Sequence, residues 1–288
     1  MKNRQKKLNR AASGKKPSLR VLYGTKGGRV LLKGFINPTA SDLMGKFMSS
    51  KASSALVPGF VRRTGIDMSR YEPKKYRTYN EFFTRKLASP PEFSSDPAAF
   101  CSPCEGFVTA YRISENSVFE IKDTDYSISD LLCSKKLSDT YTGGTCVIFR
   151  LAVHNYHRYC FFDGGHAHRT HSVTGCLHTV QPIAFEHFDV YKHNSREYTV
   201  MDTDNFGLVT QIEVGAMFVG RIVNYPATAE FKRGQEKGYF EFGGSTVILL
   251  FRPGTVSIDK NIAENSLRGI ETPVEIGQRI GTALRTTK

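Results

Sequence analysis

The chain has 288 residues, of which 40% are hydrophobic and 23% charged, with 40 Lys and Arg against 27 Asp and Glu. This length and apolar content suffice for a packed globular core. The sequence contains no run of about 18 apolar residues, so it predicts no membrane-spanning helix. Six cysteines without dense spacing, and no apolar stretch typical of a secretion signal after Met1, argue against a disulfide-stabilised secreted domain. We therefore expect a reducing, cytoplasmic environment.

The net charge of +13 is concentrated near the N-terminus. Before the first acidic residue, Asp42, stand Lys2, Arg4, Lys6, Lys7, Arg10, Lys15, Lys16, Arg20, Lys26, Arg29 and Lys33. We expect residues 1–40 to form a flexible basic arm that is attracted to an anionic membrane surface. A solvated arm without a partner is the alternative. Aromatic residues for base stacking are nearly absent from the arm, so we expect no nucleic acid partner.

Two helical patterns follow within residues 41–95, which we expect to form a helical, membrane-proximal segment. Residues 41–56 place apolar side chains at helical spacing opposite lysines, which predicts an amphipathic helix that lies in a membrane interface or packs on the core. Residues 78–81 form a capping box, which predicts a second helix that runs through Leu87 and ends before Pro90.

Short alternating or β-branched runs divided by Gly, Asn and Asp replace the helical patterns from about residue 96 onward. These runs are 106–111, 117–122, 145–153, 207–214, 217–223 and 245–251. Runs of this length with turn residues between them are typical of antiparallel strands. The sequence therefore predicts an α+β fold, in which helices precede a mainly antiparallel, sandwich-like or barrel-like catalytic domain over residues 96–288.

Histidine is confined to one part of the chain, because all eight histidines fall between His154 and His193. This concentration favours a functional site over chance. His154, His157 and Arg158 directly follow the predicted strand 145–153, at a strand end or loop where functional side chains often lie.

A second group of histidines raises the question of a metal. His166, His168 and His171, together with Cys160 or Cys176, offer ligand types that zinc accepts. Their spacing matches no standard zinc motif, and an exposed polar hairpin accounts for the pattern equally well. We therefore expect no metal site.

The stretch from Phe242 to Thr246 reads FGGST and stands directly before an apolar run. A serine hydrolase holds its nucleophile in a turn between strand and helix, whereas Ser245 begins a predicted strand. Glycine permits distorted backbone, and the Gly244 carbonyl adjoins the Ser245 hydroxyl, so this serine has the means to attack its own preceding carbonyl. A plain turn before a strand is the alternative.

Five motifs in a fixed order resemble the phosphatidylserine decarboxylase family. They are residues 80–87 (NEFFTRKL), 102–106 (SPCEG), 155–158 (NYHR), 214–217 (VGAM) and 242–246 (FGGST), and the resemblance spans about residues 76–282. The last motif matches the bacterial branch that reads GGST. The resemblance implies a carboxy-lyase of phospholipid biosynthesis that converts phosphatidylserine to phosphatidylethanolamine and CO2, bound peripherally at the cytoplasmic face of the cell membrane.

The same resemblance implies a proenzyme that cuts itself between Gly244 and Ser245. Residues 1–244 would become a large chain and residues 245–288 a small chain, and the two would remain associated. Ser245 would become a covalent pyruvoyl group, whose carbonyl takes up electrons when CO2 leaves, as pyridoxal phosphate does in other enzymes.

The family uses an Asp-His-Ser relay for this cut, and the chain departs from it at two positions. Glu105 stands where the family has the aspartate, and Cys160 stands where the family has the second histidine of its D-Y-H-R-x-H segment. His157 matches the first histidine and is the expected residue for decarboxylation. The base for cutting is expected to be either His157 or His178, with Glu105 as the carboxylate that orients it.

Three other functions remain open at this point. The first is a related pyruvoyl decarboxylase of a free amino acid. The second is a catalytically silent, lipid-binding relative, which the substitutions at Glu105 and Cys160 would explain. The third is a basic nucleic-acid-binding protein, which only the N-terminal arm suggests. Homo-oligomer formation is also left open.

Overall fold

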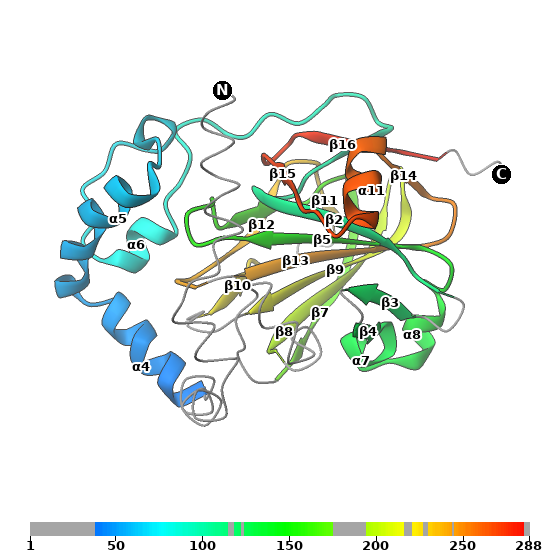
Figure 1. Ribbon diagram of the computed structural model, residues 1–288, viewed down its shortest axis with the longest axis horizontal. Coiled ribbons are helices and arrows are strands. Elements are labelled where there is room, and N and C mark those ends of the chain that lie inside the picture. Colours follow the sequence, from blue (N-terminus) through cyan, green and yellow to red (C-terminus); the bar gives the residue numbers. More distant parts are fainter. Residues whose placement is uncertain are drawn as a thin grey trace.

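The computed structural model describes residues 38–114, 118–121, 124–174, 194–215, 221–226, 230–243 and 245–284. Within these ranges the helical segment comes first and the sheets follow (Figure 1). Most of the predicted arm, residues 1–37, lies outside the described residues. Among the helices of the described part, none has the length and apolar character needed to cross a membrane.

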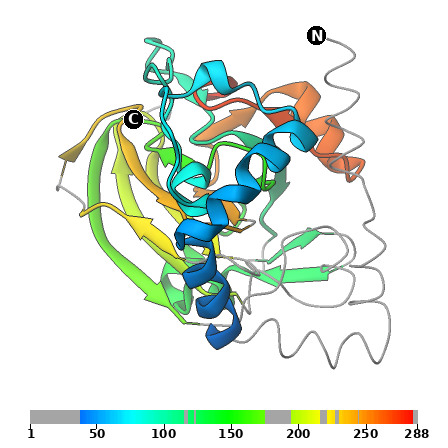
Figure 2. The same ribbon diagram turned by 90° about the vertical axis from the view of Figure 1, so that its left-hand side faces the viewer.

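Short helices make up the segment before the first strand. They are α4 (Pro38–Met48), the 3-10 helix η1 (Lys51–Ala55), α5 (Leu56–Thr64), the 3-10 helix η2 (Met68–Arg70) and α6 (Tyr79–Phe83). This segment lies at one end of the strands in Figure 1 and passes in front of them in Figure 2. A small cluster of buried aromatic residues joins α5 and α6.

The prediction of one continuous helix over residues 41–56 is wrong, because the chain breaks after Met48. The Ser53 hydroxyl donates to the carbonyls of Met48 (2.8 Å) and Ser50 (2.7 Å), which favours a turn over a continued helix. The helix α5 that follows was not predicted, because Pro58 and Gly59 resemble a turn. Pro58 is tolerated there, since the first turn of a helix leaves its N–H groups unpaired.

The second helix begins as predicted but ends early. Thr78 caps α6, and its hydroxyl accepts from the Glu81 N–H at 3.0 Å. The expected continuation to Leu87 is wrong, because the helix stops at Phe83 and Leu87 forms a β-bridge with Tyr71 instead. Tertiary pairing therefore overrides the local helical pattern.

The largest sheet has eight strands, and every described pairing in it is antiparallel. Its order is β11 (Glu230–Phe231), β7 (Gly165–Val173), β8 (Arg196–Thr203), β9 (Gly207–Gly215), β13 (Ser245–Phe251), β5 (Thr145–Leu151), β2 (Gly106–Arg112) and β15 (Thr272–Val274). The strand predicted over 245–251 agrees with β13 at both ends. Of the strand predicted over 217–223, residues 217–220 lie outside the described residues.

Smaller elements complete the described fold. They are the sheet β10 (Ile222–Asn224), β12 (Glu236–Phe240) and β6 (Arg158–Cys160), the sheet β1 (Ala99–Cys101), β16 (Arg279–Ala283) and β14 (Val256–Ile258), the hairpin β3 (Val118–Ile121) and β4 (Thr124–Ser127), and the helices α7 (Ile128–Leu132), α8 (Lys135–Asp139) and α11 (Lys260–Leu267). The predicted α+β class with mainly antiparallel sheets is confirmed. The described strands do not close into a barrel.

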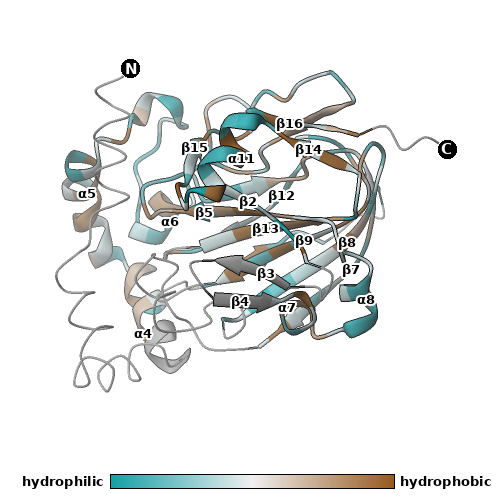
Figure 3. Ribbon diagram, turned by 45° about the vertical axis from the view of Figure 1, so that its right-hand side comes forward, coloured by the Kyte–Doolittle hydropathy of each residue, from teal (hydrophilic) through white to brown (hydrophobic). Residues whose placement is uncertain are grey.

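The hydrophobic core lies against the central strands of the large sheet. All seven residues of β13 are buried, and its β-branched and aromatic sequence suits a strand that is covered on both faces. Apolar residues follow β5 and β13 in Figure 3. The start of β13 therefore lies in the buried centre of the sheet, where strands on both sides can hold a reacting side chain in place.

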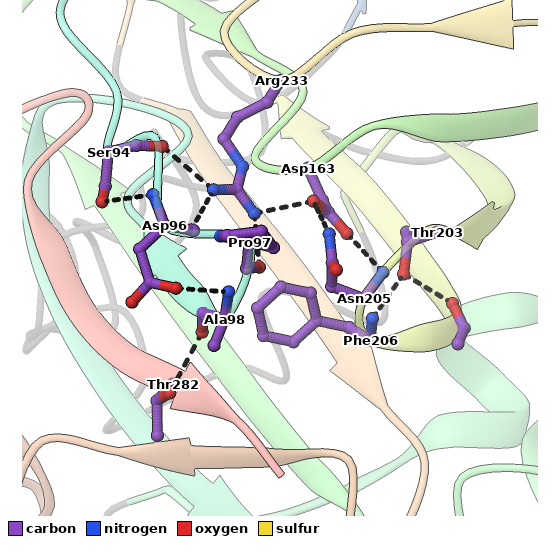
Figure 4. A network of polar contacts seen from close by, with 11 residues as sticks. Ser94, Asp96, Pro97, Ala98, Asp163, Thr203, Asn205, Phe206, Arg233 and Thr282 are labelled. Carbon is purple, nitrogen blue, oxygen red and sulfur yellow. Dashed lines mark hydrogen bonds and ion pairs between the residues drawn. The ribbon is translucent and has the colours of Figure 1, made fainter. Parts of the chain in front are cut away.

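A buried ion pair fixes the loop that leads into β1. Asp163 is 1% exposed, and its carboxylate accepts from Arg233 at 2.8 Å and from the backbone and side chain of Asn205 at 2.9 Å each. Arg233 also donates to the carbonyls of Ser94, Asp96 and Pro97 (Figure 4). This network ties together four loops, which are those before β1, between β6 and β7, between β8 and β9, and between β11 and β12.

Candidate active site

Ser245 is the first residue of β13 and is fully buried. It pairs with Leu151 on β5 and with Gly215 on β9, so both neighbouring strands hold its position. Gly243, two residues earlier, has φ 143°, a conformation that favours glycine. The prediction that Ser245 begins a strand is confirmed, whereas Gly244 lies outside the described residues.

His157 reaches Ser245 from the turn that follows β5. Its Nδ1 lies 3.0 Å from Ser245 Oγ, and its Nε2 lies 3.0 Å from the Ala152 carbonyl oxygen. A carbonyl can only accept, so Nε2 carries the proton and Nδ1 presents a lone pair to the serine hydroxyl. The structure therefore brings together a hydroxyl and an imidazole in the tautomer that can accept its proton.

The surroundings of His157 keep its imidazole neutral. The pKa of His157 is lowered from 6.5 to about 3, mainly by burial and to a smaller extent by the positive charge of Arg85, and the hydrogen bond to the Ala152 carbonyl only partly opposes this shift. The Phe83 ring lies against the imidazole with ring centroids 4.1 Å apart. The unprotonated form of His157 is thus favoured over the whole physiological pH range.

Glu105 does not contact His157 in the way that the sequence suggested. Its Oε1 accepts from Asn155 Nδ2 at 2.9 Å, and its Oε2 lies 3.5 Å from Arg70. The extra methylene of glutamate relative to aspartate does not by itself explain why Glu105 misses His157, because the carboxylate is hydrogen-bonded to Asn155 instead. The carboxylate is connected to the His157 imidazole only indirectly, through hydrogen bonds of the turn that follows β5.

Asn155 connects the carboxylate to that turn. Its Oδ1 accepts from the Ala152 N–H at 2.8 Å, and the Ala152 carbonyl in turn accepts from His157. Arg85 supports the same turn by donating to the His154 and Asn155 carbonyls, both at 3.1 Å. Sequence reasoning missed these supporting roles. The motifs NEFFTRKL and NYHR contain both Arg85 and Asn155, but nothing in them indicates a contact between the two.

Of the remaining residues considered for the cutting step, Cys160 and His178, only Cys160 lies within the described part of the chain, and it is packed away from Ser245. Cys160 is buried beside Tyr71, Tyr156 and Ile276. Burial raises the pKa of its thiol to about 12, so Cys160 cannot serve as the missing base. His178 lies outside the described residues.

Aromatic side chains from the helical segment cover the imidazole. Phe83 packs edge to face on Phe242, and Phe242 does the same on Tyr79. Tyr79 and Phe82 both contact Phe60 of α5. This aromatic cover, defined as Phe60, Tyr79, Phe82, Phe83 and Phe242, excludes water and connects the site to the outer helices.

The chain was compared with known proteins. A family model described as phosphatidylserine decarboxylase matches residues 79–282. A phosphatidylserine decarboxylase proenzyme 2 of Clostridium acetobutylicum is 44% identical over 269 residues, which cover 93% of this chain and 92% of that protein. A phosphatidylserine decarboxylase proenzyme of Ruminiclostridium cellulolyticum is 38% identical, with 98% of this chain and 96% of that protein covered.

The matched residues 79–282 contain the whole site, from Phe83 through the turn after β5 to Ser245. The similarity to both relatives extends over nearly the full length of each protein, so it is not limited to one motif. The chain belongs to the phosphatidylserine decarboxylase family.

Proposed function

We propose that the chain is a precursor that cuts itself and then decarboxylates phosphatidylserine to phosphatidylethanolamine. The observation that carries this proposal is the hydrogen bond from the buried Ser245 hydroxyl to Nδ1 of His157. A catalytically silent relative has no need to keep this pair intact. The family membership of the chain supports the substrate and the reaction.

Self-cleavage begins with proton transfer within this pair. Ser245 Oγ passes its proton to His157 Nδ1 and bonds to the Gly244 carbonyl carbon; the peptide C–N bond then breaks, and the proton goes to the Ser245 nitrogen. The product is an ester. Loss of the Ser245 α-proton next expels the Gly244 carboxylate from Cβ, and hydrolysis of the remaining dehydroalanine releases ammonia and leaves a pyruvoyl group.

The described residues around position 245 fit such a group. Ser245 is fully buried, its neighbour on β9 is Gly215, which has no side chain, and the imidazole of His157 adjoins its Oγ. A pyruvoyl group supplies an electrophilic carbonyl that takes up the electron pair left behind by CO2. His157 is placed to hold a proton close to the reacting carbon, and the aromatic cover keeps water away.

The sheet also explains how the two chains would stay together after the cut. Residues 245–251 form β13, which pairs along its whole length with β9 on one side and β5 on the other. Both of these strands belong to the large chain. Breaking the Gly244–Ser245 bond and losing the Ser245 nitrogen removes at most the ladder hydrogen bond of that nitrogen, and the pairing of residues 246–251 on both sides holds the small chain in the centre of the sheet.

A polar cavity near this end of β13 is a candidate for the substrate head group. It has a volume of about 410 Å³ and is lined by Gly215, Glu197, Asn224 and Arg221, among others. Gly215 is the strand partner of Ser245. The lining thus offers a carboxylate, an amide and a guanidinium, which suit a zwitterionic head group that carries ammonium, carboxylate and phosphate.

The helical segment supports a membrane-bound substrate. Leu43 is 71% exposed, Phe47 48% and Leu56 46%, and the basic residues Lys46 and Lys51 are exposed between them. Apolar side chains interspersed with cations are typical of helices that lie in an anionic membrane interface. We therefore propose that this segment binds peripherally to the membrane surface that contains the substrate, at the cytoplasmic face of the cell membrane.

Release of CO2 tests the substrate directly. The purified chain is expected to release CO2 from vesicles that contain phosphatidylserine and to leave free L-serine unchanged. Vesicles of phosphatidylcholine alone are the matched blank. Release from free serine at a comparable rate, with none from vesicles, would assign the chain to the decarboxylases of free amino acids.

The rate of self-cleavage is expected to be constant between about pH 5 and pH 8, because His157 stays neutral throughout that range. Its pKa is lowered from 6.5 to about 3 in the folded chain, so the proton-accepting form is present down to that lower value. The same shift costs the fold stability as the pH falls from 6.5 toward 3, where only the unfolded chain takes up the proton.

The pH profile is measured on precursor from a brief cell-free synthesis, shifted into buffers of different pH and followed by denaturing electrophoresis. A cleavage rate that falls with a midpoint near the ordinary histidine pKa would show that His157 is not the neutral base.

Replacing both Leu43 and Phe47 with serine is expected to weaken binding to phosphatidylserine-containing vesicles by at least about tenfold. Burial of each such side chain contributes about 1.5–3 kcal/mol, and the variant loses both contributions. Cosedimentation with vesicles measures the effect. The matched control is Leu267→Ser on α11, which removes a leucine that is 90% exposed but lies outside the helical segment. Equal loss in both variants would contradict a membrane-binding role for α4.

A further inference from the structure

Two histidines of β7 and an aspartate of β8 gather on the solvent-facing side of the large sheet. His166 pairs directly with Asp202, and His168 Nε2 lies 2.8 Å from Asp202 Oδ2. One ligand atom of each residue lies within 4.8 Å of those of the other two. All three residues are exposed, whereas their neighbours Ala167 and Met201 point into the core.

A β-bulge interrupts the pairing of β7 with β8 at this cluster. Ala167 pairs with Met201 and Thr170 with Thr199, so two residues of β7, His168 and Arg169, stand opposite one residue of β8. A bulge bends its strand and redirects the extra side chains. His168 lies on the same side of β7 as His166, as residues two positions apart in a strand do, and its Nε2 reaches the Asp202 carboxylate on β8.

We propose that His166, His168 and Asp202 bind one divalent transition-metal ion of the class Zn²⁺, Co²⁺, Ni²⁺ or Cu²⁺. Two imidazole nitrogens and one carboxylate oxygen suit these ions, and water completes the coordination. Hard cations such as Mg²⁺ and Ca²⁺ prefer sites made of oxygen, so they fit this donor set poorly. The proposal differs from the expectation of no metal, because sequence spacing alone could not show that Asp202 joins the two histidines.

The side chains need only a small movement to accept an ion. Two ligand atoms of a tetrahedral zinc site lie about 3.3 Å apart when the bonds are about 2.0 Å long. His168 and Asp202 are now 2.8 Å apart, joined by a hydrogen bond. Their side chains are 49% and 59% exposed, so both can turn to face an ion that replaces the shared proton.

The cluster is separate from the proposed reaction site. On β9, Leu208 pairs with Asp202 and Gly215 pairs with Ser245, and the difference of 215 − 208 = 7 residues along the strand corresponds to roughly 23 Å. A bound ion would cross-link β7 to β8 near one edge of the sheet, where the two-residue strand β11 is the one described strand beyond β7. We expect it to stabilise this edge without taking part in decarboxylation.

Titration of the full-length, chelator-treated protein tests the proposal. Co²⁺ is followed by its visible absorption and Zn²⁺ by calorimetry, and one strongly bound ion per chain is expected. His166→Ala, His168→Ala and Asp202→Ala should each weaken binding at least tenfold. Zn²⁺ should also raise the thermal unfolding midpoint of the parent chain but not that of the triple variant.

The matched control is His171→Ala, which removes another exposed histidine of β7 whose ring stacks on Tyr198 instead. It should bind Zn²⁺ as the parent does. Absence of strong binding to the parent chain, unchanged binding to the triple variant, or an equal loss in His171→Ala would overturn the proposal. Cleavage and CO2 release should persist in the triple variant, so failure at this cluster leaves the proposed decarboxylase function unaffected.

Discussion

A Ser245→Ala chain is expected to remain a single polypeptide and to release no CO2 from phosphatidylserine. The variant lacks the hydroxyl that donates to His157, so no group can attack the Gly244 carbonyl and no electrophilic carbonyl can form. Both activities should fall to background, because this residue supplies the nucleophile for cutting and the atoms of the catalytic group. Denaturing electrophoresis and CO2 release measure the two losses separately.

Thr246→Val is the matched control for that variant. Thr246 is equally buried and adjacent, but its hydroxyl has no hydrogen-bond partner among the described residues. Removing an unpartnered buried hydroxyl is close to neutral for stability or favourable. This variant should cut itself and decarboxylate as the parent does. Cleavage in Ser245→Ala would show that another bond or another residue starts the reaction.

His157→Ala is expected to slow self-cleavage by roughly 10²–10⁴-fold, the usual contribution of a positioned general base. The serine hydroxyl would keep its place on β13 but would have no acceptor for its proton. The time course of cleavage after cell-free synthesis measures the effect. Any material that does cut should also decarboxylate slowly, because the same imidazole adjoins the reacting carbon in the proposed mechanism.

Cys160→Ala tests the second histidine position of the family motif independently of the first, which His157 occupies. Cys160 occupies the place of the missing second histidine but is packed with Tyr71 and Tyr156, away from Ser245. We expect this variant to cut at the parent rate. Normal cleavage in His157→Ala would exclude His157 as the base, and a strong loss in Cys160→Ala would show that the thiol position takes part after all.

The hydrogen bonds around His157 also show which group takes the place of a carboxylate in direct contact with the imidazole. The Ala152 carbonyl fixes the tautomer of the imidazole but brings no full negative charge to stabilise its protonated form. The Glu105 carboxylate lies one step further away and is hydrogen-bonded to Asn155, which contacts the turn through the Ala152 N–H. Each chain cuts itself only once, so a weaker base is sufficient for self-cleavage. A reaction with rapid turnover would need a stronger one.

Local sequence patterns predicted the elements that depend on local interactions. The β-branched run after Ser245 predicted β13 with its correct ends, and the Thr78 capping pattern predicted the start of α6. The same reasoning failed where distant residues decide. Leu87 leaves the helical pattern to pair with Tyr71, and the serines after Met48 end the first helix by bonding to nearby carbonyls.

Sequence motifs named residues of the candidate site but could not give the contacts between them. Ser245 and His157 could be named from their motifs, yet they are 88 residues apart, and their contact depends on the pairing of β5 with β13. The role of Asn155 depends on the shape of one turn, which no spacing rule describes. The cluster of His166, His168 and Asp202 likewise depends on the pairing of β7 with β8.

The mass and N-terminal chemistry of the small chain test the central claim most directly. Intact-mass measurement of active protein should find two chains that divide between Gly244 and Ser245 of the 288 residues. The smaller should resist N-terminal sequencing and react with a hydrazine through its carbonyl group. Fully active protein that keeps this bond whole, and that contains no carbonyl reactive toward hydrazine, would contradict the account.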